Sequence, residues 1–572
     1  MKKLLLGNEA VARGVWEAGA TVASAYPGTP STEITEYLAK YEDIFCEWAP
    51  NEKVSLEVAI GASIAGARAV CAMKHVGLNV AADPLFTAAY TGVNGGLVIL
   101  VADDPGMHSS QNEQDSRYYA KSAHVPMLEP ADSSECKDYV KMAFDLSEKY
   151  DTPVIVRLTT RIAHSQSIVQ INDKCNYQLK DYKKDATKYV MMPGMARLRH
   201  PLVEEREIRL AEDSNTLPVN TIEEGKSQIG IIAAGIAYQY AKDAFPEASF
   251  LKLGMVYPLP IKLIKEFAKS VETLIVIEEL EPFIEEQIKA AGVNVTGKDL
   301  YTIQGEYSVN MLKREMPDYS KEENSKIDLP ARPPVMCAGC PHRGTFYVLK
   351  KLGLIVSGDI GCYTLGALAP VAAIDTVVCM GASIGIAHGM NKARGDDFAK
   401  KTVAIIGDST FIHSGITGLI DIVYNKGVST TIILDNSITG MTGHQENPTT
   451  GKTIKGEPTK QVDLVKLSQA VGVDRVTVVD PFDIKKLEEV IKEETNVPEP
   501  SVIIVQRPCA LLKGVKFEGT QKIDRDKCKN CKMCLKIGCP AIRNNNGDVE
   551  INSALCVGCK LCNKMCKFNA IV

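Results

Sequence analysis

The sequence predicts a multidomain α/β protein with two doubly wound parallel-sheet domains, a smaller α/β domain between them and a short α+β tail. Three observations support this prediction. The chain has 572 residues, which is too long for one hydrophobic core. Short apolar runs alternate with stretches of helical period along most of its length, as in parallel sheets covered by helices. Eight cysteines, including Cys528 and Cys566, gather near the carboxyl end.

The strand and helix patterns divide the chain into four predicted domains. These domains are residues 1–180, 225–315, 335–515 and 520–572. Buried strands are predicted within residues 95–106, 152–160, 228–245, 271–280, 402–408 and 430–436. A helix rich in small residues is predicted at 57–70. The charged segment 171–220 is predicted to be an irregular connector, and the polar, proline-bounded segment 316–334 is predicted to be a linker.

Composition excludes several classes of protein. The net charge is −5 and basic residues form no long run, so nucleic-acid binding has no support. No stretch approaches the roughly 18 apolar residues of a membrane helix, and the apolar run at the amino end stops at Leu6, so we expect neither a membrane span nor a signal peptide. We therefore predict a cytoplasmic protein. Its 17 cysteines then indicate metal or redox centres rather than disulfides.

The cysteine-rich tail resembles a bacterial ferredoxin with two clusters. Three of its cysteines are spaced C-x2-C-x2-C and precede Cys539-Pro540, and a second run is spaced C-x2-C-x2-C-x3-C. The resemblance implies that three cysteines of each run and the fourth of the other hold one [4Fe–4S] cluster. The implied sets are Cys528, Cys531, Cys534 and Cys566, and Cys556, Cys559, Cys562 and Cys539. The first run has four residues before Cys539 where three are usual. Zinc is the alternative occupant of such cysteine pairs, although the tandem triplets disfavour it.

Polar residues close two of the predicted strands of the third domain. Gly407-Asp408 ends one strand, and Asn436 ends the next, 28 residues after Asp408. Ligands of open α/β sheets bind outside the carboxyl ends of strands. We expect Asp408, Asn436 and the backbone carbonyl of Ile438 to bind Mg²⁺, which shares its other positions with phosphate oxygens. Gly407 would let a diphosphate approach the backbone at a helix N-terminus. Two ordinary strand-end turns are the alternative.

This spacing resembles the signature of thiamine-diphosphate enzymes, with Ser409 in place of the usual second glycine. Those enzymes also need a glutamate against the aminopyrimidine ring of the cofactor. Glu52 lies nine residues before Gly61 of the small-residue helix and matches the placement of that glutamate. Glu57 can be aligned instead, so both remain candidates.

Thiamine domains and a two-cluster tail in one chain resemble the 2-oxoacid:ferredoxin oxidoreductases over essentially the whole sequence. YPGTPSTE (26–33) is similar to the family loop that meets the substrate carboxylate, with Thr29 at the contacting position. KHVGLNVAADP (74–84), which includes Gly77 and Asn79, matches the segment at the pyrimidine end of the cofactor. CAGCPHRG, GDSTFIHSG and MTGHQ resemble one branch best, the α subunits of indolepyruvate ferredoxin oxidoreductases.

The resemblance implies an activity and a set of partners. It implies oxidative decarboxylation of aryl pyruvates, such as indolepyruvate and phenylpyruvate, to aryl-acetyl-CoA, with electrons passed through iron–sulfur clusters to ferredoxin. The implied cofactors are thiamine diphosphate, Mg²⁺ and two tail clusters, with coenzyme A as co-substrate. The partner is a smaller β subunit, and α2β2 is the expected assembly.

Four of the cysteines outside the tail form a further candidate set: Cys337, Cys340, Cys362 and Cys509. Some relatives of the superfamily hold a cluster with cysteines in this order, so we hypothesise a third [4Fe–4S] cluster that accepts the first electron. The alternative is a set of free thiols that shape a loop. His342 follows the C-x2-C pair and is a candidate to face the substrate. For His413 and His444, a catalytic role and a structural role are both open.

Three alternative functions remain open. The same chemistry on another 2-oxoacid is one. A non-catalytic electron-transfer subunit with vestigial thiamine domains is another, and a thiamine decarboxylase without redox function is the third.

Overall fold

The computed structural model describes residues 1–316, 330, 333–517 and 519–572. The chain divides into two compact units, Met1–Lys326 and Ile327–Val572. The predicted linker at 316–334 lies mostly outside the described residues. Among the residues described, no helix combines the length and the apolar character that crossing a membrane requires.

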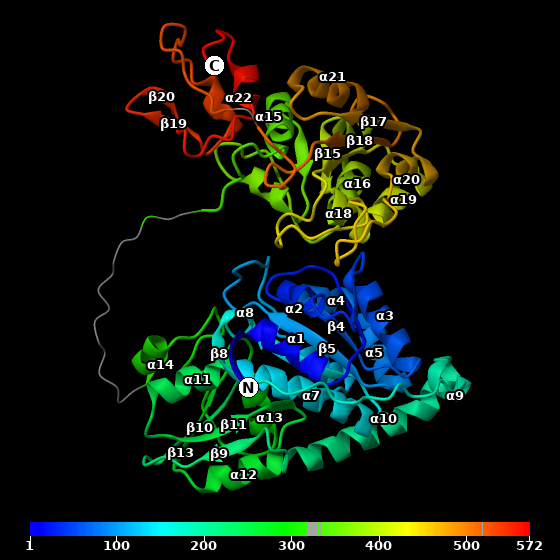
Figure 1. Cartoon of the computed structure of the whole chain (residues 1–572), viewed down its shortest axis with the longest axis vertical. Helices are drawn as coiled ribbons and strands as arrows, with labels where there is room; N and C mark the ends of the chain where they lie inside the picture. Colours follow the sequence, from blue (N-terminus) through cyan, green and yellow to red (C-terminus); the bar gives the residue numbers. More distant parts are fainter. Residues whose placement is uncertain (317–329, 331–332, 518) are drawn as a thin grey trace. The chain divides into compact units, whose positions relative to one another are not determined.

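A seven-stranded sheet forms the centre of the first unit (Figure 1). Its strands follow the order β12-β6-β7-β5-β4-β2-β3. The edge strand β12 (Met255–Tyr257) is antiparallel to β6, and the other pairs are parallel. The remaining strands are β2 (Val22–Ala25), β3 (Phe45–Trp48), β4 (Ala69–Lys74), β5 (Leu97–Asp103), β6 (Met127–Leu128) and β7 (Val154–Thr159). All residues of β4, β5 and β7 are buried, as continuous apolar runs in parallel sheets require. The strands predicted within 95–106 and 152–160 are thus confirmed as β5 and β7.

Helices alternate with the strands of this sheet. They are α1 (Gly7–Glu17), α2 (Thr32–Leu38), α3 (Glu52–Ile64), α4 (His75–Val80), α5 (Ala82–Thr91), α6 (Arg117–Ala123), α7 (Ser133–Tyr150) and α8 (Thr160–His164). The small-residue segment predicted at 57–70 supplies the end of α3 and the start of β4. Helix α1 packs along α7. Strands β1 (Lys2–Leu6) and β8 (Gln166–Gln170) form a separate antiparallel pair.

The prediction of an irregular connector at 171–220 is wrong in part. The segment contains α9 (Ala186–Tyr189) and the 22-residue helix α10 (Pro193–Ser214). Only Val203, Arg206, Leu210 and Ser214 of α10 are buried. These residues follow helical spacing, but two are polar, so the apolar stripe is too thin to see among the surrounding charges. Buried Arg206 donates hydrogen bonds to the carbonyl oxygens of Ala89 and Asp151, both at 3.0 Å.

A second sheet in the first unit has four strands in the order β13-β10-β11-β9. Its strands are β9 (Thr221–Glu223), β10 (Ile229–Ala234), β11 (Ser249–Leu253) and β13 (Thr273–Ile277), and its helices are α11 (Gly235–Ala244), α12 (Ile261–Lys269), α13 (Phe283–Ala290) and α14 (Val309–Glu315). The strands predicted within 228–245 and 271–280 are confirmed as β10 and β13.

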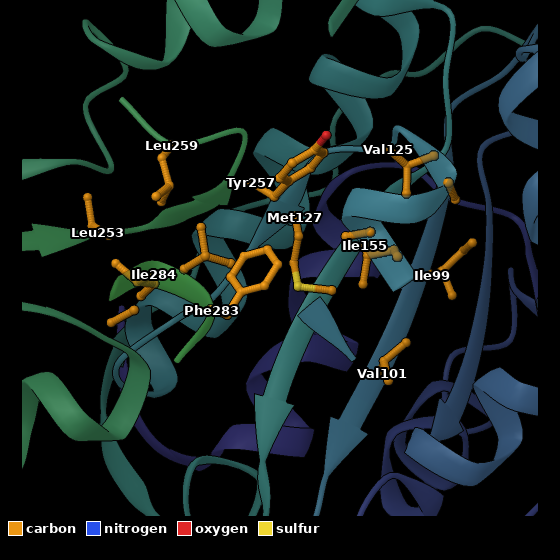
Figure 2. Packing of buried hydrophobic residues seen from close by; sticks show 14 of the residues in the cluster. Ile99, Val101, Val125, Met127, Ile155, Leu253, Tyr257, Leu259, Phe283 and Ile284 are labelled. Carbon is orange, nitrogen blue, oxygen red and sulfur yellow. The ribbon is translucent and has the colours of Figure 1, made fainter. Parts of the chain in front are cut away.

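The two sheets of the first unit share one hydrophobic core. Met127 and Ile155 of the seven-stranded sheet pack with Tyr257, Phe283 and Ile284 from the second segment (Figure 2). Each of these side chains is at most 5% exposed, and burial of one such side chain contributes about 1.5–3 kcal/mol. The segment 225–315 therefore packs as part of the first unit.

Buried ion pairs join the same two segments. Arg117, which is 1% exposed, pairs with Asp115 and, at 2.5 Å, with Glu278 beyond β13. Within the seven-stranded sheet itself, Arg157 of β7 pairs with Asp103 of β5 at 2.7 Å. Removal of one partner would leave an uncompensated buried charge, which costs about 3–5 kcal/mol.

The second unit is built on a five-stranded, fully parallel sheet in the order β14-β15-β16-β18-β17. Its strands are β14 (Ile355–Ser357), β15 (Thr402–Gly407), β16 (Thr430–Asp435), β17 (Arg475–Val479) and β18 (Ser501–Gln506). Its helices are α15 (His342–Leu352), α16 (Ala382–Arg394), α17 (Asp396–Ala399), α18 (Asp408–Thr410), α19 (Ile416–Tyr424), α20 (Leu464–Ala470) and α21 (Ile484–Glu494). The strands predicted at 402–408 and 430–436 are confirmed as β15 and β16.

The cysteine-rich tail forms a small α+β layer in the second unit. A hairpin of β19 (Ile542–Asn545) and β20 (Asp548–Ile551) accompanies α22 (Leu561–Met565) and a 3₁₀ turn at Met533–Ile537. Its core residues Ile537, Leu561 and Met565 cluster with Phe482 of the sheet domain, and the 3₁₀ turn contacts α15. The tail therefore packs on the sheet domain.

Candidate functional site

Asp408 and Asn436 lie at the carboxyl edge of the second unit's sheet. Asp408 directly follows β15 and Asn436 directly follows β16, and these two strands are hydrogen-bonded neighbours in which Gly407 pairs with Leu434. Both side chains are buried, with exposed fractions of 2% and 7%. The structure thus brings the two predicted magnesium ligands to one edge of the sheet.

The surroundings of Asp408 suit a cation. Its Oδ2 accepts hydrogen bonds from the hydroxyl of Thr449 at 2.8 Å and the amide of Asn447 at 3.4 Å, both neutral donors. Burial, and next the charge of Asp435, raise the pKa of Asp408 to about 7. A divalent cation at this edge would compensate the buried carboxylate, so the donor set fits Mg²⁺.

The turn after β16 is held by its own polar groups. The backbone N–H of Ile438 donates to Asn436 Oδ1 at 3.2 Å, and Ser437 adopts a left-handed backbone with φ of 59°. Ser409 lies within hydrogen-bond distance of Thr439 of the same turn, at 3.0 Å between hydroxyl oxygens. The predicted residues Ser409, Asn436 and Ile438 therefore form one connected edge.

Gly407 has a packing partner that the sequence did not reveal. A methyl group at Gly407 would lie 2.7 Å from the ring of Tyr363. Tyr363 in turn contacts His342 edge to face, with ring centroids 6.0 Å apart. Burial lowers the pKa of His342 to about 4, so its imidazole is neutral at pH 7. His342 thus lies one side chain away from the strand end.

Histidines 413 and 444 lie near the same edge. His413 belongs to a π turn at Phe411–Gly415, a feature frequent at functional sites, and its Nδ1 is 2.9 Å from the hydroxyl of Ser414. His444 Nε2 is 4.0 Å from the sulfur of Cys509. Neither contact assigns a catalytic role.

Four of the cysteines outside the tail, Cys337, Cys340, Cys362 and Cys509, lie close enough to influence one another electrostatically. Burial and then the thiols of Cys509 and Cys337 raise the pKa of Cys362 to about 11, and the thiols of Cys337 and Cys362 act in the same direction on Cys340. A methyl group on Gly440 would lie 3.3 Å from Cys362 Sγ and 3.8 Å from Asn436 Nδ2.

Cys509 reaches the same turn by its backbone. Its N–H donates to the carbonyl of Asn436 at 2.9 Å. Cys509 therefore contacts the strand end that carries the predicted metal ligand, and Cys362 lies beside Gly440 of the turn that follows.

The tail cysteines line two separate cavities, and the division matches the two predicted sets. Cys528, Cys531, Cys534 and Cys566 line one cavity with apolar residues such as Ile523 and Ile571. Cys539, Cys556, Cys559 and Cys562 line the other. Backbone N–H groups of Gln521 and Ala570 donate to Cys556 Sγ at 3.4 Å and Cys566 Sγ at 3.3 Å. Such bonds stabilise thiolates that ligate iron, so these cavities fit iron–sulfur clusters.

Zinc is still the alternative occupant of these cysteine sets. Within the described ranges, no group of three or more histidine, cysteine or acidic side chains is arranged to hold a metal ion.

The first unit distinguishes the two candidate glutamates. Glu52 is 3% exposed and begins α3, whose N-cap residue Asn51 accepts from the N–H of Val54 at 3.0 Å. The Glu57 side chain is 44% exposed and pairs with Lys53. Glu52 packs on Gly77, where a methyl group would lie 2.7 Å from Glu52 Oε1. Burial beside the predicted pyrimidine segment favours Glu52.

Thr29 lies in a loop that Ser109 and Lys74 support. The hydroxyl of Ser109 donates to the carbonyl of Thr29 at 3.0 Å, and Lys74 Nζ donates to the carbonyl of Ser109 at 2.8 Å. Burial lowers the pKa of Lys74 to about 8, against the opposing charges of Asp104 and Glu52. Lys74 is a cationic residue near the predicted carboxylate loop that sequence reasoning did not single out.

Asn79 is exposed and held by two neighbours. Its Oδ1 accepts from the hydroxyl of Tyr119 at 2.6 Å, and its amide donates to Gln114 at 2.9 Å. Sequence reasoning also missed Asn447 and Thr449, which donate hydrogen bonds to Asp408. Thr449 lies 41 residues from Asp408 in the sequence, and no local pattern predicts a contact at that separation.

Two family models match the chain. "Pyruvate flavodoxin/ferredoxin oxidoreductase, thiamine diP-bdg" matches residues 13–216, and "Thiamine pyrophosphate enzyme, C-terminal TPP binding domain" matches residues 359–505. Together with the parallel sheets and the edge site, they define a thiamine-diphosphate-dependent oxidoreductase of the 2-oxoacid:ferredoxin class.

Relatives align along the whole chain. Indolepyruvate oxidoreductase subunit IorA of Archaeoglobus fulgidus is 40% identical, with 100% of this chain and 97% of the relative covered. The subunit of the same name from Pyrococcus horikoshii is 41% identical, with coverage of 100% and 96%. A solved 2-oxoglutarate:ferredoxin oxidoreductase from Magnetococcus marinus is 19% identical, covers 54% of this chain and 64% of its own, and has a TM-score of 0.46. The chain belongs to the family of indolepyruvate oxidoreductase α subunits.

Proposed function

We propose that this chain, with a smaller β subunit, oxidatively decarboxylates aryl pyruvates such as indolepyruvate and phenylpyruvate. The products are aryl-acetyl-CoA and CO₂, and the electrons pass through iron–sulfur clusters to ferredoxin. The names of the relatives that align over the full chain support the aryl substrate. Their designation as a subunit supports a partner chain, and we propose an α2β2 assembly.

One observation carries the electron-transfer part of the proposal. Cys362 lies beside Gly440 of the turn after β16, and Cys509 donates its backbone N–H to the Asn436 carbonyl. Two thiols of the proposed set are therefore close to the predicted cofactor edge. An electron released at that edge would meet the thiol set directly.

Residues of the chain have distinct roles in this proposal. Asp408, Asn436 and the carbonyl of Ile438 hold Mg²⁺ and thereby the diphosphate. Glu52 holds a proton at N1′ of the aminopyrimidine, and Thr29 binds the substrate carboxylate. Thiamine diphosphate, when bound, supplies the electron sink for cleavage of the carbon–carbon bond.

The three sets of thiols hold three [4Fe–4S] clusters in the proposed enzyme. Cys337, Cys340, Cys362 and Cys509 hold the first electron acceptor, and the two tail sets hold the clusters that serve ferredoxin. Anaerobically purified chain should contain about twelve irons. About eight would reject the first cluster and leave the two tail clusters.

Anaerobic turnover of the reconstituted subunits tests the activity. A panel of 2-oxoacids is supplied with CoA and ferredoxin, and we expect the highest kcat/KM for indolepyruvate and phenylpyruvate. Preference for pyruvate or 2-oxoglutarate would reject the aryl assignment. Release of aldehyde without ferredoxin or viologen reduction would indicate a simple decarboxylase. No turnover with the β subunit present would indicate a non-catalytic electron-transfer chain.

A further inference from the structure

Arg343 lies between the loop of Cys337 and the loop that precedes Cys539. It is the second residue of α15 and is 2% exposed. Its Nε donates to the carbonyl of Cys337 at 3.1 Å, and its Nη2 donates to the carbonyl of Met336. Its Nη1 donates to the carbonyl of Ile537 at 3.1 Å and to that of Gly538. One guanidinium therefore ties the two loops together.

The two loops also share a wall of the cavity lined by Cys539, Cys556, Cys559 and Cys562. Ala338 and Gly339, which separate Cys337 from Cys340, line that cavity, as does Arg343. A methyl group on Gly339 would lie 2.6 Å from Val557 Cγ2. The backbone between two thiols of one set therefore faces the cavity of the next set.

Thiols are the titratable groups that surround the buried Arg343 guanidinium, whose pKa is lowered by burial. In the part of the chain that the structure describes, no carboxylate forms an ion pair with Arg343, although Arg117 and Arg157 of the first unit each have acidic partners. Beyond burial, the influences on the pKa of Arg343 are the thiols of Cys340, Cys539, Cys337 and Cys559. These belong to two different sets. A buried guanidinium without counter-charge is costly, so it is stabilised when iron ionises those thiols.

We propose that Arg343 is a positioning residue that couples the Cys337–Cys340 centre to the neighbouring tail centre. Its hydrogen bonds hold the two loops at a fixed separation, and its positive charge stabilises an added electron on either centre. One electron leaves the first centre, which is oxidised, and enters the second, which is reduced. Ferredoxin is the final acceptor, and the guanidinium neither gains nor loses a proton. This inference rests on the proposed function, because it needs clusters at both sets of thiols.

The test compares Arg343→Gln and Arg343→Lys with a matched surface control. Arg543→Gln serves as the control, because Arg543 is a 63% exposed tail residue that pairs with Glu550 across the hairpin. Each variant is assembled with the β subunit and thiamine diphosphate and assayed for iron. Midpoint potentials are measured by redox titration monitored by electron paramagnetic resonance.

We expect Arg343→Gln to shift the potentials of the two coupled centres to more negative values and to slow ferredoxin reduction about tenfold or more. Arg343→Lys keeps the charge but cannot reach four carbonyl oxygens, so its potentials should stay near wild type while transfer remains slow. The control should match the wild type. If the Arg343→Gln variant loses iron, the rate of electron transfer in the Arg343→Lys variant tests the inference instead.

Two results would overturn the inference, and they are distinguishable. Wild-type enzyme with about eight irons lacks the first centre, and wild-type enzyme without turnover lacks the proposed function; either result removes the inference as well. Wild-type enzyme with about twelve irons and full turnover, but with unchanged potentials and transfer rates in both Arg343 variants, rejects the inference alone.

Discussion

Replacement of Gly77 by alanine tests whether Glu52 is the activating carboxylate of this enzyme. Gly77 lies in α4, and an added methyl group would be 2.7 Å from both Cγ and Oε1 of Glu52. Ordinary contact begins at 3.4 Å, so the carboxylate must retreat by about 0.7 Å. Because Glu52 is buried at the start of α3, this retreat changes where its oxygen meets the cofactor.

The expected loss follows from that displacement. Misplacement of a catalytic group by about 1 Å costs on the order of 10²-fold in rate, so kcat of Gly77→Ala should fall by about two orders of magnitude. Overpacking should also lower the free energy of unfolding by about 1–3 kcal/mol. Affinity for Mg²⁺ at Asp408 and the iron content should not change, since those residues belong to the other compact unit.

The assay separates activation from folding. Exchange of the C2 proton of bound thiamine diphosphate, followed by NMR, reports activation directly, and thermal unfolding reports stability. Gly61→Ala is the matched control, because it adds the same methyl group to α3 where no atom lies within 4 Å. That control should keep full activity and gain up to about 1 kcal/mol. Glu57→Gln, at an exposed position, should also keep full activity.

The reasoning fails if Gly77→Ala folds and exchanges the C2 proton at the wild-type rate. It also fails if Glu57→Gln loses activity and Glu52→Gln does not, since burial would then have pointed to the wrong carboxylate.

Three further predictions concern separate parts of the chain. Asn436→Ala should abolish retention of thiamine diphosphate, measured on the desalted protein, while tail iron stays intact; loss of both would show general unfolding. Cys559→Ala should leave decarboxylation partly active but block ferredoxin reduction, and normal reduction would show that the electron path is misassigned. Burial raises the pKa of Glu279 from 4.5 to about 7 in the folded protein. The protonated carboxyl group therefore stabilises the fold fully below pH 4.5, and this contribution is lost as the pH rises through 7. Glu279→Gln should therefore be more stable than wild type by up to about 3 kcal/mol at pH 8 and by little near pH 4.5, as measured by denaturant unfolding. Equal differences at both pH values would contradict this.

The strands were predictable because their signal is local. Fully buried parallel strands read as continuous apolar runs, and β5, β15 and β16 are such runs. The residues that close those strands, Asp408 and Asn436, follow from the same signal. Helix α10 was missed because its stripe of buried residues is thin and includes a buried arginine that is stabilised by distant carbonyl oxygens.

Contacts between distant segments were not predictable from spacing. The bond from Thr449 to Asp408, the support of the Thr29 loop by Lys74 through Ser109, and the packing of Glu52 on Gly77 each join residues that only the fold makes neighbours. Both glutamates matched the same spacing, and burial alone distinguishes them.

The sequence by itself determined the fold class and the residues that close the strands, because periodicity and strand ends are properties of short segments, and its resemblance to ferredoxins implied the cysteine sets. Only the tertiary structure decided which thiols share a cavity wall, which glutamate is buried and that Arg343 bridges two loops. These features depend on groups that are distant in the sequence, such as Arg343 and the carbonyls of Ile537 and Gly538 nearly 200 residues later, where packing and buried charge, not local pattern, select the partners.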